Sequence, residues 1–338
     1  MSIDKVRTGS SLEDVQPNQQ KTFGLMGESL SFQTNDDRLL AIADEAFGRF
    51  PLSDDRSEPP LIVRLFVREG HDHGEKPLQA RQTKPIYHQQ DHIFTILVGA
   101  DNFAVADLSR GFAYGFITPE LLDDRDFVRI NFIEAMSLCL LGFARNYAVV
   151  HAACVIKDEL SVLIHGKAGS GKSTLAFACV RRGYKILAED VVFCKSQSGE
   201  LQLWGAPWKF HLLPDAKQLF PELHDLGRLV TISGEAKIEL DLEALYPGCT
   251  RTNARAGILI LLTRNSDQPI GIAKLSRRQA MQEFEFHWPW SAGWNDQLEA
   301  NGQRLLDGEV YRLNLNRTPE QGVDILDELL VNLRERYA

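Results

Sequence analysis

The chain has 338 residues, of which 44% are hydrophobic and 25% charged, and its formal net charge is -9. A chain of this length can bury enough apolar surface for two domains, and its composition is typical of a globular protein and not of a disordered one. The acidic balance argues against a protein whose main task is to grip nucleic acid or an anionic membrane, because both surfaces attract cationic proteins.

The cysteines and the chain start indicate a cytoplasmic protein. Five widely spaced cysteines without a Cys-x-x-Cys pair form neither a disulfide framework nor a zinc site. Residues 1–21 lack the apolar stretch of a secretory signal and are predicted to be a flexible tail. The apolar segment 132–150 is interrupted by Glu134 and Arg145, which favours a buried helix leading into a strand over a membrane span.

Residues 22–147 are predicted to form an α+β domain. Alternating apolar runs predict strands at 61–67, 92–99, 102–108 and 111–117, mostly in an antiparallel meander, with a helix at 37–47. A long helix from residue 126 to 145 leads into the second half. We expect this domain to recognise an acceptor or another partner.

Residues 148–338 are predicted to form an α/β domain. Strands are expected at 148–156, 161–165, 184–193, 201–205, 237–242, 256–263 and 309–315, and helices at 172–182, from 276, near 294–306 and at the C-terminus. For the last helix, Thr318, Pro319 and Gln321 predict a capping box with proline at the first helical position.

The stretch HGKAGSGKST between a predicted strand and a predicted helix satisfies the Walker A pattern, with Gly166, Gly171, Lys172 and Ser173 at its fixed positions. Backbone N–H groups of such a loop converge on phosphates, the lysine offsets their charge, and the serine hydroxyl binds Mg²⁺. The sequence therefore predicts ATP and Mg²⁺ as cofactors. The expected binding residues are Gly166, Lys167, Ala168, Gly169, Ser170, Gly171, Lys172, Ser173 and Thr174.

An acidic pair, Glu189 and Asp190, ends the next predicted strand, where a parallel neighbour would bring it beside Lys172 and Ser173. Two adjacent carboxylates can share the work, one holding Mg²⁺ and the other accepting a proton from an acceptor hydroxyl. An exposed acidic turn is the plainer alternative. His151 opens the strand before the P-loop, and by itself it would be read as a structural histidine.

These features occur in a fixed order from residue 149 to 193: histidine, P-loop, a helix ending in Arg182-Gly183, and a strand ending in the acidic pair. This order resembles the HPr serine kinase/phosphorylase family and its divergent relatives. The resemblance implies a C-terminal P-loop kinase core like that of phosphoenolpyruvate carboxykinase. It also implies that Glu189 transfers the proton, Asp190 binds metal and His151 supports them. Glu189 is one methylene longer than the family's usual Asp, so the reverse assignment stays open.

The resemblance implies an ATP-dependent kinase acting on a hydroxyl, with Ser or Thr of a protein or peptide as acceptor. A small-molecule hydroxyl kinase and a nucleotide-binding sensor with little phosphotransfer are the alternatives, and homo-oligomerisation stays open. We expect no nucleic-acid or membrane partner.

Further residues are candidates for substrate contacts. The γ-phosphate could be reached by Lys237, Arg251 or Arg255, each of which could equally be a surface charge. The stretch GAPWKFHLLPDA offers acceptor contacts or simply core residues, namely Trp208, Lys209, His211 and Asp215.

Overall fold

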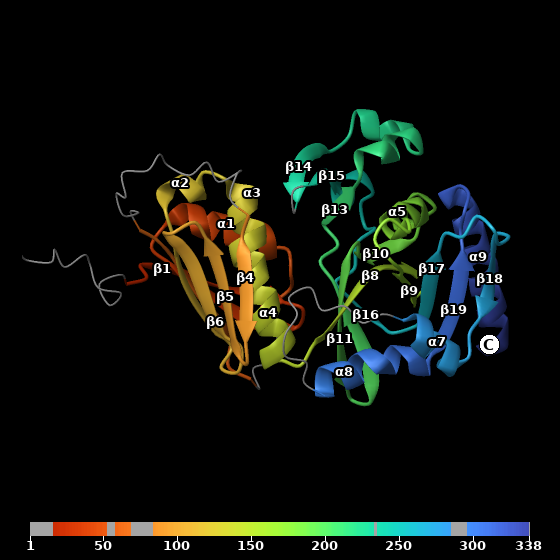
Figure 1. The fold of residues 1–338 in the computed structure, drawn as a ribbon, viewed down its shortest axis with the longest axis horizontal. Coiled ribbons are helices and arrows are strands. Elements are labelled where there is room, and N and C mark those ends of the chain that lie inside the picture. The colour runs from red at the N-terminus through yellow and green to blue at the C-terminus, as the bar shows by residue number, and fades with distance from the viewer. Residues whose placement is uncertain (1–15, 53–57, 69–83, 233–234, 285–295, 338) are drawn as a thin grey trace, which may run out of the picture. The chain divides into compact units, whose positions relative to one another are not determined.

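The computed structural model describes residues 16–52, 58–68, 84–232, 235–284 and 296–337. The chain divides into two compact units, residues 1–145 and 146–338, and the described strands form three sheets with helices packed on them (Figure 1). The fold is therefore mixed α/β. Of the predicted tail, residues 1–15 lie outside the described residues, whereas Gln19–Lys21 belong to the first strand and were wrongly assigned to the tail.

The first unit contains a seven-stranded sheet in the order β1-β2-β3-β7-β6-β5-β4. The predicted antiparallel meander is confirmed for β5 to β7 and is extended by β4, which was not predicted. Strand β3 instead pairs in parallel with both β2 and β7, which the sequence did not reveal. The strands are β1 (Gln19–Leu25), β2 (Glu28–Thr34), β3 (Leu61–Val67), β4 (Ile86–Gln90), β5 (Ile93–Val98), β6 (Asn102–Asp107) and β7 (Phe112–Ile117).

The helices of this unit pack on its sheet. Helix α1 spans Asp37–Phe47 as predicted, is capped by the Asp36 side chain, and buries Leu39 and Ile42 at helical spacing. The others are α2 (Pro119–Leu122), α3 (Arg125–Val128), a π-helical segment (Arg129–Glu134) and α4 (Ala135–Ala144). Among the described helices, the stretch Arg125–Ala144 is long and apolar enough to span a membrane by length and composition, but 61% of it is buried, as in a core helix.

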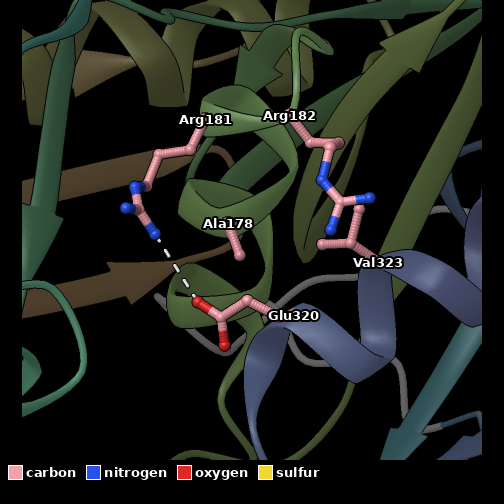
Figure 2. Close-up of a pocket in the computed structure, with 5 residues that line it drawn as sticks. All are labelled: Ala178, Arg181, Arg182, Glu320 and Val323. Carbon is pink, nitrogen blue, oxygen red and sulfur yellow. Dashed lines mark hydrogen bonds and ion pairs between the residues drawn. The ribbon is translucent and has the colours of Figure 1, made fainter.

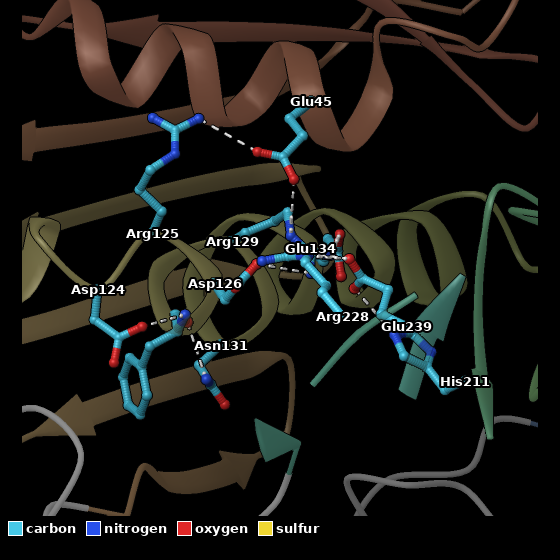
Figure 3. A network of polar contacts seen from close by, with 11 residues as sticks. Glu45, Asp124, Arg125, Asp126, Arg129, Asn131, Glu134, His211, Arg228 and Glu239 are labelled. Atoms are coloured by element: carbon cyan, nitrogen blue, oxygen red, sulfur yellow. Dashed lines mark hydrogen bonds and ion pairs between the residues drawn. The ribbon is translucent and has the colours of Figure 1, made fainter. Parts of the chain in front are cut away.

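Arg129 is a buried charge inside the π-helical segment. Its side chain is 3% exposed, and its guanidinium donates to Glu134 at 2.6 Å and to Asp126 at 3.3 Å (Figure 3). Glu45 of α1 lies 3.7 Å from Arg129 Nε and 3.3 Å from Arg125. The arginine thus joins α1 to the long helix, because the carboxylates that neutralise it come from both.

The second unit contains a nine-stranded sheet in the order β16-β12-β11-β8-β9-β17-β19-β18, with β10 also paired to β8. Strands β9, β17 and β19 are parallel neighbours, and the other pairs are antiparallel. The strands are β8 (Ala148–Lys157), β9 (Leu160–His165), β10 (Lys185–Ala188), β11 (Val191–Gln197), β12 (Glu200–Trp204), β16 (Asn253–Arg255), β17 (Ile258–Thr263), β18 (Gly271–Lys274) and β19 (Glu309–Asn314).

Both faces of this sheet are covered. Val162 and Ile164 of β9 pack in one core with α5 (Lys172–Arg181) and α9 (Pro319–Tyr337), whereas Leu163 between them packs in a second core with α7 (Arg277–Glu283). The alternation follows from the period of two along a strand. The P-loop strand is therefore buried on both sides and holds the loop that follows it in place.

A small three-stranded sheet in the order β13-β15-β14 completes this unit. Its strands and the remaining helices are β13 (Lys209–Leu212), β14 (Arg228–Ile232), β15 (Glu235–Asp241), α6 (Leu242–Leu245), α8 (Asp296–Gln303) and the 3-10 segments Pro214–Gln218, Pro221–His224 and Arg304–Asp307. Phe210 and Leu240 of the small sheet are buried in the core that holds α5. Helix α9 begins at Pro319 as predicted, but Gln321 Oε1 accepts no hydrogen bond from the part of the chain that the structure describes, so the predicted capping box is incomplete.

Strands β8 and β9 form a tight hairpin. Their register pairs Lys157 with Leu160, which leaves a two-residue turn of Asp158 and Glu159 with φ of 48° and 64°. Left-handed conformations at both turn positions are typical of a type I′ turn, whose twist matches that of the strands. The hairpin brings His165, the last residue before the P-loop, opposite Ala152.

Candidate functional site

The P-loop motif follows β9 and runs into the first turn of α5, which begins at Lys172. Gly169 and Gly171 have φ of 77° and 95°, where a side chain would be strained. A β-carbon on Gly166 would come within 2.5 Å of the Leu262 carbonyl oxygen and 2.8 Å of Ser170 Oγ. The glycines of the motif are thus required by conformation at two positions and by close packing at the third.

Two polar groups of the loop indicate what it can hold. Lys172 is 6% exposed and its Nζ donates to the carbonyl oxygens of Gly166 at 2.8 Å and Lys167 at 3.4 Å. Burial lowers the pKa of Lys172, although the nearby charges of Asp190 and Glu189 act against this shift. Ser170 Oγ is buried in the loop and has no hydrogen-bond partner among the described residues. An orphaned hydroxyl and a cation in a glycine loop fit the phosphates of a nucleotide.

The acidic pair lies at a break in strand pairing. The predicted strand 184–193 is divided into β10 and β11, both of which pair antiparallel with β8, and Glu189 and Asp190 lie between them. The expected parallel neighbourhood with the P-loop strand is therefore wrong, since β8 separates β9 from β10 and β11. The interruption lets the two carboxylates leave the sheet in different directions.

Glu189 faces the start of α5. Its side chain is 9% exposed, and its Oε1 accepts a hydrogen bond from Ser173 Oγ at 2.5 Å. Ser173 is the P-loop hydroxyl that the motif assigns to Mg²⁺. Hydroxyl and carboxylate oxygens are ligands that Mg²⁺ accepts together with phosphates and water, so this pair fits a magnesium site.

Asp190 has a different partner. Its Oδ1 lies 3.0 Å from His151 Nδ1, and the two side chains are 47% and 37% exposed. His151 is placed there by the pairing of β8 with β11, which sets it opposite Val191. Burial raises the pKa of Asp190, but the hydrogen bond and charge of His151 and the charges of Lys237 and Lys172 outweigh it, so the pKa is lowered. Asp190 is thus ionised and accessible.

His211 of β13 contacts the other oxygen of Glu189. Its Nδ1 lies 3.5 Å from Glu189 Oε2, and its Nε2 lies 3.1 Å from Glu239 Oε2. Arg228 donates to Glu239 Oε1 at 2.7 Å (Figure 3). Burial lowers the pKa of His211, but the hydrogen bonds from its ring to the two carboxylates raise the pKa by a larger amount. The net shift of the pKa is therefore upward. The stretch GAPWKFHLLPDA therefore supplies a neighbour of the acidic pair.

The other cations that the sequence singled out lie in different surroundings. Lys237 of β15 lies near enough to Lys172 and Asp190 for its charge to lower both pKa values. Arg251 instead pairs with Glu159 at 3.0 Å, and Arg255 pairs with Glu200 at 2.9 Å. Of these cations, Lys237 is the one whose charge acts on the site.

A shallow pocket lies at the opposite end of α5 from the P-loop. Ala178, Arg181, Arg182, Glu320 and Val323 line it (Figure 2). Its charges are paired, since Arg181 Nη1 lies 3.5 Å from Glu320 and Arg182 Nη1 lies 3.1 Å from Asp324. A helix rises about 1.5 Å per residue, so this pocket is more than one helical turn away from Lys172. Arg182 thus binds α9 and takes no part in the phosphate cradle.

Sequence reasoning did not find Arg264, which lies beside the P-loop. A β-carbon on Gly171 would come within 3.2 Å of Arg264 Nη2. A signal was present, because Arg264 directly follows the apolar strand β17, and the carboxyl ends of parallel strands carry the chemistry of α/β proteins.

No family model matches this chain, and no curated protein sequence matches it. Among solved structures it is similar to the Hpr(Ser) kinase/phosphatase from Coxiella burnetii. That similarity covers 56% of this chain and 91% of the other, with 18% sequence identity and a TM-score of 0.33. At this level of similarity, the function has to be argued from the site itself.

Proposed function

We propose that this protein is an ATP-dependent phosphotransferase that moves the terminal phosphoryl group of ATP to a hydroxyl group. The supporting observation is that two adjacent carboxylates face different partners beside one P-loop: Glu189 bonds Ser173, and Asp190 bonds His151. A nucleotide sensor needs the phosphate cradle and a metal ligand but no second, accessible carboxylate. The Asp190–His151 pair therefore favours transfer over sensing.

The geometry favours the exchange of roles that the longer Glu189 side chain left open. Glu189 and Ser173 supply oxygen ligands on the metal side, where bound Mg²⁺ would offset phosphate charge. Asp190 is the proton acceptor because it is ionised and more exposed, and His151 orients it through a 3.0 Å contact. Lys172 neutralises the charge that develops on the phosphoryl oxygens.

In the proposed step, one bond to the γ-phosphorus forms and one breaks. The acceptor oxygen forms a bond to the γ-phosphorus as the bond from that phosphorus to the bridging oxygen breaks. ADP leaves with the electron pair of the broken bond. The hydroxyl proton passes to Asp190.

We assign the acceptor to Ser or Thr of a protein or peptide, which rests on the sequence resemblance described above, and acceptor recognition to residues 22–147. A small-molecule hydroxyl is the competing acceptor class. Cytoplasmic location is proposed because all five cysteines are free and buried.

The test is incubation of the protein with γ-labelled ATP, Mg²⁺ and the purified products of neighbouring genes, with a small-molecule extract in a parallel reaction. If a protein becomes labelled, and the label is stable to acid but is lost in base, the result would support transfer to Ser or Thr. The Lys172→Ala variant is the matched control. If the protein binds nucleotide but neither reaction gives more label than the Lys172→Ala control, the proposal would be overturned. The nucleotide-binding sensor would then be the remaining function.

A further inference from the structure

Arg264 lies against the mouth of the P-loop. Gly171 has a φ of 95°, and a β-carbon built on it would be 3.2 Å from Arg264 Nη2 and 3.5 Å from Cζ and Nε. Nη2, Cζ and Nε of Arg264 thus all lie near the glycine that precedes Lys172. Because Gly171 has no side chain, nothing from that residue separates the guanidinium from the loop.

The turn that carries Arg264 is fixed by a buried asparagine. Asn314, at the end of β19, is 5% exposed and its Oδ1 accepts from Asn265 N at 2.8 Å. Its Nδ2 lies within 3.1 Å of the carbonyl oxygens of Asn265, Gln268 and Pro269. On the other side of Arg264, Thr263 is the last residue of β17 and is paired with Asn314 in the sheet. The backbone on both sides of Arg264 is therefore held.

The positively charged guanidinium of Arg264 is accessible to an anion. Arg264 is exposed, and among the described residues its side chain makes no hydrogen bond or ion pair. Glu189 and Asp190 are already bound to Ser173 and His151. An arginine held at a phosphate cradle, with no carboxylate partner in the described parts of the chain, is suited to an anion, since its planar fork matches phosphate oxygens.

We propose that Arg264 binds the terminal phosphate of ATP in the P-loop, as a second cation besides Lys172. This inference rests on the proposed nucleotide site and adds a residue that the Walker motif does not include. Lys172 begins α5 after the loop that follows β9, whereas Arg264 directly follows β17, the parallel neighbour of β9. The two cations approach the phosphates from two different segments, the start of α5 and the turn after β17, and hydrogen bonds from Arg264 offset the charge on the phosphoryl oxygens during transfer.

The test compares Arg264→Gln with Arg278→Gln, an exposed arginine on α7 whose sequence neighbour Arg277 pairs with Asp307. Affinities for ATP and ADP are measured in Mg²⁺ by fluorescence titration, and melting temperatures show that both variants fold. Arg264→Gln should weaken ATP about 10- to 100-fold, as expected for the loss of a charged hydrogen bond, and ADP much less. Arg278→Gln should change neither affinity.

The same variants separate this inference from the proposed function. If the parent protein phosphorylates an acceptor and Arg264→Gln binds ATP as tightly as the parent, Arg264 does not contact the phosphate although the protein is a kinase. Equal weakening of ATP and ADP would also overturn the assignment to the terminal phosphate. If the parent binds ATP but labels no acceptor, a selective loss of ATP affinity in Arg264→Gln still supports the contact.

Discussion

Glu189 and Asp190 are neighbours in sequence but bind opposite sides of the site: Glu189 Oε1 accepts from Ser173 at 2.5 Å, and Asp190 Oδ1 lies 3.0 Å from His151. The break in strand pairing between β10 and β11 allows this arrangement. In a continuous strand the two side chains would also point to opposite faces, but the backbone of both residues would be held in the hydrogen-bonded ladder. Replacing each of the two acids by its amide should therefore impair activity in a different way.

Asp190→Asn should lower kcat by about 10²- to 10⁴-fold, because a general base contributes roughly that factor, while ATP affinity in Mg²⁺ changes little. Glu189→Gln should raise the Mg²⁺ concentration needed for half-maximal activity and be partly rescued by added metal. Initial rates over a range of Mg²⁺ concentrations measure both. The opposite pattern would return the base role to Glu189.

Lys172→Ala should abolish turnover and weaken ATP binding, because it removes the buried cation that the P-loop holds 2.8 Å from the Gly166 carbonyl. Lys274→Ala is a suitable control, since Lys274 is an exposed lysine on β18 that pairs with Glu309. Isothermal titration with ATP and a labelling assay follow the two effects. Full phosphotransfer by Lys172→Ala would mean that this loop is not the active cradle.

His211 should stabilise the metal-free protein in a pH-dependent way. Its pKa is raised in the folded state by hydrogen bonds to Glu189 and Glu239 that overcome its burial. Its contribution is therefore complete below the unfolded pKa of about 6.5 and is lost as the pH rises through the folded pKa.

We expect His211→Gln to lower the free energy of unfolding by about 1.5–3 kcal/mol near pH 6, where charged hydrogen bonds are lost, and by less near pH 9. His224→Gln, at an exposed histidine in the same unit, should show no such difference. Urea unfolding at both pH values measures it. A loss for His211→Gln that is equal at pH 6 and pH 9 would mean that His211 is neutral in the folded protein.

Arg129→Ala should destabilise the first unit by about 1.5–3 kcal/mol, because it removes the charged hydrogen bonds to Glu134 and Asp126 and the contact with Glu45. Arg110→Ala removes an exposed arginine that lies 3.6 Å from Asp107, and it should cost less than about 1 kcal/mol. Urea unfolding compares the two variants. Similar losses for both would mean that burial adds nothing to the Arg129 network.

The sequence predicted what depends on local spacing. Helix α1 was correct at both ends because Asp36 caps it and Leu39 and Ile42 recur at helical period. The P-loop was found because strand, glycines and helix are contiguous. The parallel pairing of β3 with β2 and β7 could not be predicted, because the alternation of apolar residues along a strand does not specify which strands it pairs with.

The contacts of the site were predictable to a smaller extent. His211 of β13 contacts Glu189, and Glu239 of β15 in turn contacts His211, but no spacing rule connects these three residues. Arg264 depends on Asn314, fifty positions further along the chain, which holds its turn. Residues of this kind are brought together by the sheet order, which sequence periodicity does not encode.

The hairpin turn at Asp158 and Glu159 ties the end of the chain to its middle. A left-handed conformation costs a non-glycine residue about 1–2 kcal/mol, and both turn residues have it. Each of them also pairs with a distant arginine: Asp158 with Arg334 in the last turns of α9, and Glu159 with Arg251. A fusion partner or affinity tag joined directly after α9 would therefore lie near this turn, which is at the end of β9 opposite to the P-loop.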